Sequence, residues 1–263
     1  MSKILLETKN LTVRFGGLTA VNGLDLQVEE GKIVGLIGPN GAGKTTVFNM
    51  ITGAIQPTEG DILFDGKSIV GMRPDKIARL GLSRTFQNIR LYEKITALEN
   101  IIISMQRQPS YSLFEAFLRT KRVRQEDARV KEKAYDYLKM VGIEQYADSP
   151  AGSLPYGLQR RLEIARALAT EPRLIQLDEP AAGMNNEECD SLIHLIHDIH
   201  DKLGITIILI EHHMDVVVDL CDDIYVLNLG KLLAKGTPSE IQSNPDVISA
   251  YLGEGRKGKY ERD

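Results

Sequence analysis

The sequence predicts an α/β fold that has a parallel-sheet core, an N-terminal antiparallel β subdomain and an inserted α-helical subdomain. After residue 170, apolar strand-like runs alternate with helical stretches, which indicates parallel βαβ units. Short strand-like runs with glycine punctuation fill the beginning of the chain, including a hairpin-like pair at 60–64 and 67–70 around an Asp-Gly turn. From about 96 to 170 the apolar spacing is helical instead.

The strand-like runs define the expected order of the elements. Alternating or apolar runs predict strands at 5–8, 11–15, 24–28, 33–37, 82–86, 174–177, 206–210 and 223–227. We expect one domain over 1–253, in which about 1–87 and 168–253 form the core with its β subdomain and about 88–167 form the helical subdomain. Residues 254–263 are polar and charged, and we expect a loose tail there.

A glycine-rich segment follows the apolar run 33–37 and runs from Gly38 to Thr46. It fits the pattern Gly-x4-Gly-Lys-Ser/Thr, in which a loop wraps a polyphosphate with backbone N–H groups. Glycines let the chain turn tightly and approach phosphates without an intervening side chain. Lys44 is expected to neutralise the β- and γ-phosphates, and the Thr45 hydroxyl to ligate Mg²⁺.

A glycine-rich turn that binds nothing is the alternative interpretation. The strand-like run before the segment and the helix-compatible run after it favour the phosphate site, because the positive end of the helix would point at the anion. The sequence therefore predicts that a nucleoside triphosphate binds to Gly38, Asn40, Gly41, Ala42, Gly43, Lys44, Thr45 and Thr46.

Two carboxylates end the apolar run 174–177, namely Asp178 and Glu179. Ligands bind at the carboxyl edge of a parallel sheet, which is where this run would place them. Asp178 is expected to hold Mg²⁺ through water, and Glu179 to polarise the water that attacks the γ-phosphorus. A strand that ends in Asp-Glu-Pro is usually only a turn, but a phosphate loop in the same chain favours the catalytic interpretation.

Two further polar residues also follow predicted strands. Gln87 comes after the run 82–86, where its amide would reach the metal and the attacking water. His212 comes after the run 206–210, where it would donate a hydrogen bond to the γ-phosphate. Taken alone, Gln87 would be an exposed loop residue and His212 a structural histidine, so their assignment depends on the other motifs.

These motifs, in this order, resemble the ATPases of ABC transporters over about residues 4–252. The segment 154–158 is similar to the family's signature motif Leu-Ser-Gly-Gly-Gln, although Pro155, Tyr156 and Leu158 depart from it. The resemblance implies a P-loop core of the RecA type. It also implies that Tyr156 and Gly157 contact ATP bound to an opposite subunit. Pro155 supplies neither a hydroxyl nor an N–H there, and Asn185 stands where the family usually has aspartate.

The resemblance also implies that Phe15 stacks on adenine, with a core phenylalanine as the alternative. The implied cofactors are ATP and Mg²⁺, the latter held by Thr45, Gln87 and Asp178. The implied partners are a second ABC ATPase subunit (in a homodimer or heterodimer), membrane permease subunits and, indirectly, a solute-binding protein.

Segments 156–167, 179–185, 210–215 and 244–253 resemble the importers of branched-chain amino acids, and the stretch 109–123 resembles the larger of their two ATPase subunits. The implied function is ATP hydrolysis that powers import. The ATPases of related systems for urea or short amides, or for lipopolysaccharide export, have similar sequence motifs. A soluble ABC protein acting on ribosomes or DNA is a rival, as is a P-loop kinase, although a kinase would not explain the full set of motifs.

Composition limits the remaining choices. The formal net charge of −4 disfavours a general nucleic-acid surface, so no nucleic acid is expected as a partner. The two cysteines have no metal-site spacing, and no apolar run is long enough to span a bilayer. We expect a cytoplasmic protein that is peripheral on the inner face of the membrane. The basic segment 119–133 is interpreted as a solvated helix face, with anionic lipid headgroups as the alternative partner.

Overall fold

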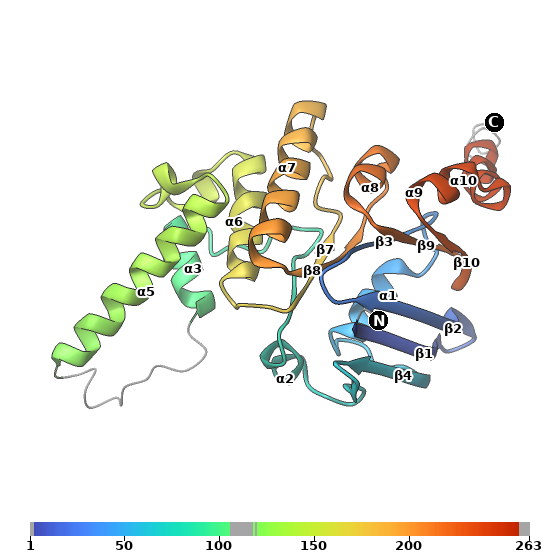
Figure 1. Ribbon diagram of the computed structural model, residues 1–263, viewed down its shortest axis with the longest axis horizontal. Helices are drawn as coiled ribbons and strands as arrows, with labels where there is room; N and C mark the ends of the chain where they lie inside the picture. The colour runs from blue at the N-terminus through green and yellow to red at the C-terminus, as the bar shows by residue number, and fades with distance from the viewer. Residues whose placement is uncertain (1–2, 106–117, 119, 258–263) are drawn as a thin grey trace. The chain divides into compact units, whose positions relative to one another are not determined.

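The computed structural model describes residues 3–105, 118 and 120–257, with the backbone alone for 252–257. Of the stretch 109–123 noted above, residues 109–117 and 119 lie outside the described residues. The chain folds into two compact units, drawn in Figure 1. One contains the chain up to Arg84 and from Arg173 onward, and the other contains Thr85–Pro172.

A six-stranded sheet forms the centre of the first unit, in the order β10-β9-β3-β8-β7-β6. Its parallel strands are β6 (Leu82–Arg84), β7 (Leu174–Asp178), β8 (Thr206–Ile210), β3 (Ile33–Ile37) and β9 (Asp223–Asn228). The edge strand β10 (Lys231–Gly236) is antiparallel to β9. All residues of β3, β7 and β8 are buried, as expected for a parallel sheet that is covered on both faces.

A four-stranded antiparallel sheet, in the order β2-β1-β4-β5, forms the β subdomain. Its strands are β1 (Ile4–Phe15), β2 (Leu18–Glu29), β4 (Glu59–Phe64) and β5 (Lys67–Ser68). Both runs predicted as strands, 5–8 and 11–15, are strand, but they form one continuous strand, β1. Its register shifts between Thr8 and Leu11, where Asn10 has a φ of 48°. The gap between the two predicted runs is therefore a β-bulge within one strand.

Helix α1 (Lys44–Ile51) packs between the two sheets of this unit (Figure 1). One buried apolar cluster joins its Val47, Phe48 and Ile51 to side chains of β1 and β2 on one side and of β3 and β8 on the other. Gly35 of β3 faces the opposite way, since a Cβ there would lie 3.0 Å from the sulfur of Cys221. The helices α7 (Asn186–Leu203) and α8 (Met214–Leu220) cover that opposite face (Figure 1).

Three further helices complete the first unit: α2 (Pro74–Arg79), α9 (Pro238–Ser243) and α10 (Pro245–Lys257). Helix α10 continues to Lys257, so the first four residues of the tail predicted from residue 254 are helical. Residues 258–263 lie outside the described residues.

The second unit is helical. It contains α3 (Ala97–Met105), α5 (Lys121–Met140) and α6 (Tyr156–Leu168), with 3-10 turns at Glu144–Tyr146 and Ala151–Ser153. Its insertion between β6 and β7 agrees with the predicted helical subdomain, and the predicted α/β architecture of the core is confirmed. Within the described ranges, none of the helices combines the length and the hydropathy that a membrane span requires.

Candidate active site

The glycine-rich segment forms a tight loop between β3 and α1. Gly38 has a φ of 149°, and a Cβ there would lie 2.1 Å from the carbonyl oxygen of Leu227. Gly43 has a φ of 103°, and its Cβ would lie 2.6 Å from the carbonyl oxygen of Ala20. A side chain at either position would therefore collide with a neighbouring backbone. The two glycines let the loop lie against β2 and β9 and present its own backbone outward.

Lys44 closes this loop from inside. Its ammonium group is buried and donates hydrogen bonds to the carbonyl oxygens of Gly38 at 2.6 Å and Pro39 at 3.0 Å. Helix α1 begins at Lys44, and no side chain caps it. The first N–H groups of a helix have no partner within the helix, and they carry its partial positive charge. The loop therefore combines a buried cation with a helix N-terminus that no side chain caps, which is the arrangement that binds phosphate.

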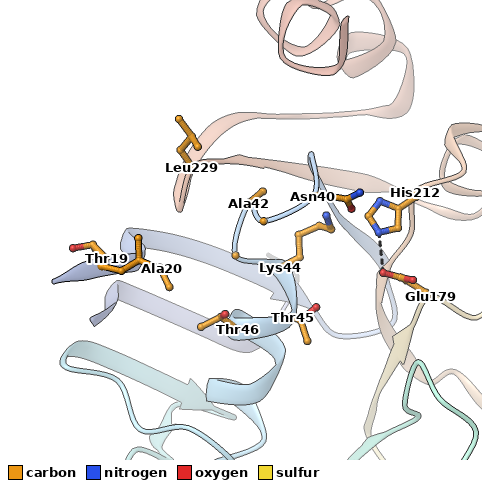
Figure 2. A pocket seen from close by; sticks show the side chains of 13 residues that line it. Thr19, Ala20, Asn40, Ala42, Lys44, Thr45, Thr46, Glu179, His212 and Leu229 are labelled. Carbon is orange, nitrogen blue, oxygen red and sulfur yellow. Dashed lines mark hydrogen bonds and ion pairs between the residues drawn. The ribbon is translucent and has the colours of Figure 1, made fainter. Parts of the chain in front are cut away.

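A cavity of about 380 Å³ opens over the loop. Figure 2 shows Lys44 near its middle, Glu179 and His212 at one end, and Thr19, Ala20 and Leu229 at the other. Most of the residues predicted to bind nucleotide in this unit line the cavity, namely Asn40, Gly41, Ala42, Gly43, Lys44, Thr45 and Thr46. The cavity is therefore polar and charged at one end and largely apolar at the other.

Three predicted nucleotide ligands of this unit lie outside the lining of the cavity: Gly38, Phe15 and Asp178. Gly38 shapes the loop from beneath, as described above. Phe15 ends β1 with its ring about half exposed, and it pairs across the β1–β2 turn with Leu18, which does line the cavity. Leu18 and Leu229 were not predicted as site residues. Leu229 is 83% exposed, a feature that depends on the turn between β9 and β10.

Asp178 is the last residue of β7 and is almost fully buried. Its carboxylate pairs with the guanidinium of Arg84 at 2.6 Å, and Arg84 also donates to the side chain of Asn49 at 2.7 Å. Arg84 ends β6, the neighbouring strand, so the pair crosses the sheet, and Asn49 lies on α1. Sequence reasoning missed Arg84 and Asn49. A charged residue in the middle of a predicted strand was the available signal for Arg84.

Glu179 and His212 follow two neighbouring strands, β7 and β8, and the structure brings their side chains together. The His212 ring nitrogen Nε2 lies 2.8 Å from the Glu179 carboxylate (Figure 2). The Glu179 backbone has a φ of 48°, and its N–H donates to the carbonyl oxygen of Ile210 at 2.9 Å. This left-handed conformation turns the chain sharply at the end of β7. An uncommon backbone conformation of this kind at a non-glycine residue is typical of functional sites.

The remaining predicted residues belong to the helical unit. Tyr156 and Gly157 begin α6, and Tyr156 is about half exposed. Arg160, one turn later, is fully buried and donates to the backbone carbonyl groups of Phe86 at 2.8 Å and Gln87 at 2.9 Å. The backbone of Gln87 is therefore attached to the helix that carries Tyr156 and Gly157.

A buried ion pair supports this attachment. Glu163 accepts a hydrogen bond from Arg160 at 2.6 Å and another from the Phe86 N–H at 3.2 Å. Burial raises the pKa of Glu163, while the charge of Arg160 and the N–H donors act in the opposite direction. Sequence reasoning missed this pair, although an arginine and a glutamate three residues apart on a helix are the signal that predicts such contacts.

The donor set suits a magnesium ion that arrives with a nucleotide. Thr45 presents a hydroxyl in the cavity. Asp178, which ends β7 outside the cavity lining and pairs with Arg84, would reach the ion through water. Among the described residues, no three His, Cys, Asp or Glu side chains cluster into a metal cage. Mg²⁺ is usually held by one or two protein ligands together with substrate phosphates and water, and these residue types fit that pattern.

Comparison with known proteins places this site in a family. The sequence model of the ABC transporter family matches residues 21–182, and a model described as the branched-chain amino acid ATP-binding cassette transporter matches residues 231–257. The high-affinity branched-chain amino acid transport ATP-binding protein BraF of Pseudomonas aeruginosa is 49% identical over 254 residues, which cover 97% of this chain and 100% of that protein. The chain belongs to the ABC transporter ATP-binding proteins.

Solved ABC cassettes share its fold. The ADP conformation of MJ1267, an ATP-binding cassette of an ABC transporter, matches with a TM-score of 0.83 and 33% identity over 95% of this chain and 99% of that one. The dimeric structure of MJ0796, a bacterial ABC transporter cassette, matches with a TM-score of 0.74 and 25% identity over 89% of this chain and 99% of that one. These matches confirm the predicted P-loop cassette architecture.

The close fit of Gly43 generates a prediction about nucleotide affinity. We expect Gly43→Ala to weaken ATP binding roughly tenfold or more, because the new Cβ would displace the loop from Ala20 and strain its backbone. Gly41→Ala is the matched control, since Gly41 also has a positive φ but a Cβ there would meet nothing within 4 Å. Titration of both variants with a fluorescent ATP analogue measures the effect. Equal dissociation constants for the two variants would contradict the prediction.

Proposed function

We propose that this chain is the ATP-hydrolysing subunit that powers an ABC importer of branched-chain amino acids. The ATPase assignment rests on the family. The substrate class is supported by the match of residues 231–257 to the branched-chain family and by 49% identity to BraF, whose name states that role. The observation that carries the catalytic part is the contact of 2.8 Å between Glu179 and His212 at one end of the phosphate-loop cavity.

The two ends of the cavity give the direction in which ATP would lie. The γ-phosphate belongs at the end that holds Glu179 and His212, and the adenosine belongs at the end that holds Thr19, Ala20 and Leu229 (Figure 2). Leu18, which precedes Thr19 in the chain, also lines the cavity. Apolar side chains suit the faces of a purine, and the exposed ring of Phe15 adjoins Leu18 for stacking. The phosphate-loop residues Gly38, Asn40, Gly41, Ala42, Gly43, Lys44, Thr45 and Thr46 would hold the polyphosphate between these ends.

The chemistry follows from the charges at the γ-phosphate end. Glu179 would polarise the attacking water as a general base. His212, whose Nε2 contacts the Glu179 carboxylate in this structure, would donate a hydrogen bond to the γ-phosphate once ATP is bound. Lys44 would leave the loop carbonyl groups and neutralise the phosphates. Thr45 and Asp178 would hold Mg²⁺, which when bound supplies neutralisation of the developing charge. The metal role predicted for Gln87 rests on the family resemblance alone.

A second ABC ATPase subunit, identical or homologous, would complete the site. In a head-to-tail pair, Tyr156 and Gly157 of one subunit would contact ATP on the other. The N–H groups at the start of α6 and the half-exposed ring of Tyr156 support this role. Pro155 has neither the hydroxyl nor the N–H with which a serine at this position would contact ATP. The dimeric MJ0796 cassette supports the pairing. Asn185 caps α7 by accepting the Glu188 N–H, a task that aspartate performs equally well.

Membrane permease subunits would receive the motion, and a solute-binding protein would act on them from the other side. The segment 87–91 is the proposed contact, because Arg160 attaches its first residue to α6 and Arg166 donates to the backbone carbonyl of Arg90. ATP binding stabilises the closed pair because it binds that state better than the open one. The chain would then be cytoplasmic and peripheral on the inner face of the membrane.

Removal of the proposed general base tests the mechanism. We expect Glu179→Gln to bind ATP with its usual affinity and to hydrolyse it at least about a hundredfold more slowly, because an amide does not accept the proton of water. Glu59→Gln, at an exposed glutamate of β4, is the control and should keep the normal rate. Single-turnover hydrolysis and ATP titration measure the two quantities. Turnover within a few-fold of wild type would remove Glu179 from this role.

Reconstitution tests the transported solute. The purified complex of this chain with its permease subunits, in vesicles, should hydrolyse ATP several-fold faster when a binding protein loaded with leucine, isoleucine or valine is added, because the loaded protein favours the closed state. Binding proteins loaded with urea or a short amide serve as controls. Stimulation by these, or co-purification with ribosomes or DNA in place of permeases, would contradict the proposed substrate class while leaving the ATPase assignment intact.

A further inference from the structure

A buried carboxylate lies directly beside the catalytic end of the cavity. Glu211 follows β8, whose five residues are all buried, and is itself only 1% exposed. It does not line the cavity, so it would not touch ATP. A buried carboxylate is costly unless hydrogen bonds compensate its lost hydration. Its partners therefore indicate what the group is for.

The partners of Glu211 lie on two different loops. One carboxylate oxygen accepts the backbone N–H of Ala181 at 2.7 Å, and the other accepts the backbone N–H of His212 at 3.1 Å. Ala181 lies two residues after Glu179, on the loop that leaves β7. Burial raises the pKa of Glu211, and the N–H donors of Ala181 and His212 oppose this shift because they stabilise the charged form. Glu211 therefore joins the loop after β7 to the loop after β8.

Two other contacts run between the same loops. The Glu179 N–H donates to the carbonyl oxygen of Ile210 at 2.9 Å, and the Glu179 carboxylate meets His212 at 2.8 Å. Two hydrogen bonds thus hold the chain around Glu179 to the loop after β8. The first joins the Glu179 N–H to Ile210, and the second joins the Ala181 N–H to Glu211. The second depends on the side chain of Glu211, whereas the first is backbone to backbone. Loss of the Glu211 carboxylate would release the chain just beyond Glu179.

We propose that Glu211 is a positioning residue that holds the Glu179 carboxylate against His212. This inference rests on the proposed function of Glu179 as the general base. A carboxylate is suited to the task because both of its oxygens accept hydrogen bonds. The side-chain amide of a glutamine would instead place its own N–H donors next to one of the two backbone N–H groups, so one hydrogen bond would be lost. Such a residue acts on the chemical step and not on nucleotide affinity, because the phosphate loop and Lys44 do not depend on it.

Kinetics of Glu211→Gln and Glu211→Ala test the proposal. We expect kcat to fall about tenfold or more in Glu211→Gln and further in Glu211→Ala, with an ATP dissociation constant within about twofold of wild type. Glu30→Gln is the control for stability alone, since Glu30 forms an ion pair with Arg173 on the surface of the same unit. It should keep the normal kcat. Should Glu211→Ala fail to fold, the isosteric Glu211→Gln variant still decides the question.

A double-mutant cycle separates positioning from general support of the fold. In the Glu179→Gln background, Glu211→Gln should slow the residual hydrolysis no further, because the group it positions is already absent. Amide exchange at Ala181 should also be faster in Glu211→Gln. A kcat above about half of wild type in Glu211→Gln, or the same fold loss in both backgrounds, would overturn the proposal. Absence of hydrolysis by the wild-type protein would instead contradict the proposed function itself.

Discussion

The parallel pairing of β3, β7, β8 and β9 is the constraint on which the whole site depends. Backbone hydrogen bonds fix the register of these strands, so their carboxyl ends meet at one edge of the sheet. The phosphate loop, Glu179, His212 and Leu229 each follow one of these strands. Segments from distant parts of the sequence therefore line one cavity.

A covered parallel sheet excludes water, so each charge at this edge requires a partner. Asp178 has Arg84, the Lys44 ammonium has two loop carbonyl groups, and Glu211 has two backbone N–H groups. Burial of a paired charge costs less free energy than burial of an isolated one. Removal of one partner leaves the other buried without a hydrogen bond or an opposite charge. The same contacts hold the loops in fixed positions. The polar network therefore accounts both for the stability of this edge and for the geometry of its reactive groups.

Much of this arrangement could be predicted from the sequence, because local pattern dictates it. The strands at Ile33–Ile37 and Thr206–Ile210 match their predicted bounds, since both are short apolar runs with clear limits. Parallel topology then brings Glu179 and His212 to one edge. Helix α9 was missed, although Thr237, Pro238 and Glu240 form a recognisable helix start with a capping box.

Other features could not be predicted because they depend on contacts between distant segments. The bulge at Asn10, the pairing of Arg84 with Asp178 and the burial of Glu211 arise only when strands and loops pack together. Arg160 is similar: Glu163 three residues later predicts an ion pair, but no local pattern predicts full burial of Arg160 against the backbone of Phe86 and Gln87. The roles of Gln87, Tyr156 and Gly157 stay predictions, as they rest on the family resemblance.

Calorimetric titration of the purified chain with ATP and magnesium tests the central claim most directly, with Lys44→Ala as the comparison. The account predicts saturable binding by the wild-type chain and a large loss of affinity in the variant, because Lys44 supplies the fixed cation of the phosphate loop. Inorganic tripolyphosphate should bind more weakly than ATP, since it lacks the base that Leu18 and Leu229 would contact. No heat with ATP, or equal affinity of both proteins, would contradict the account.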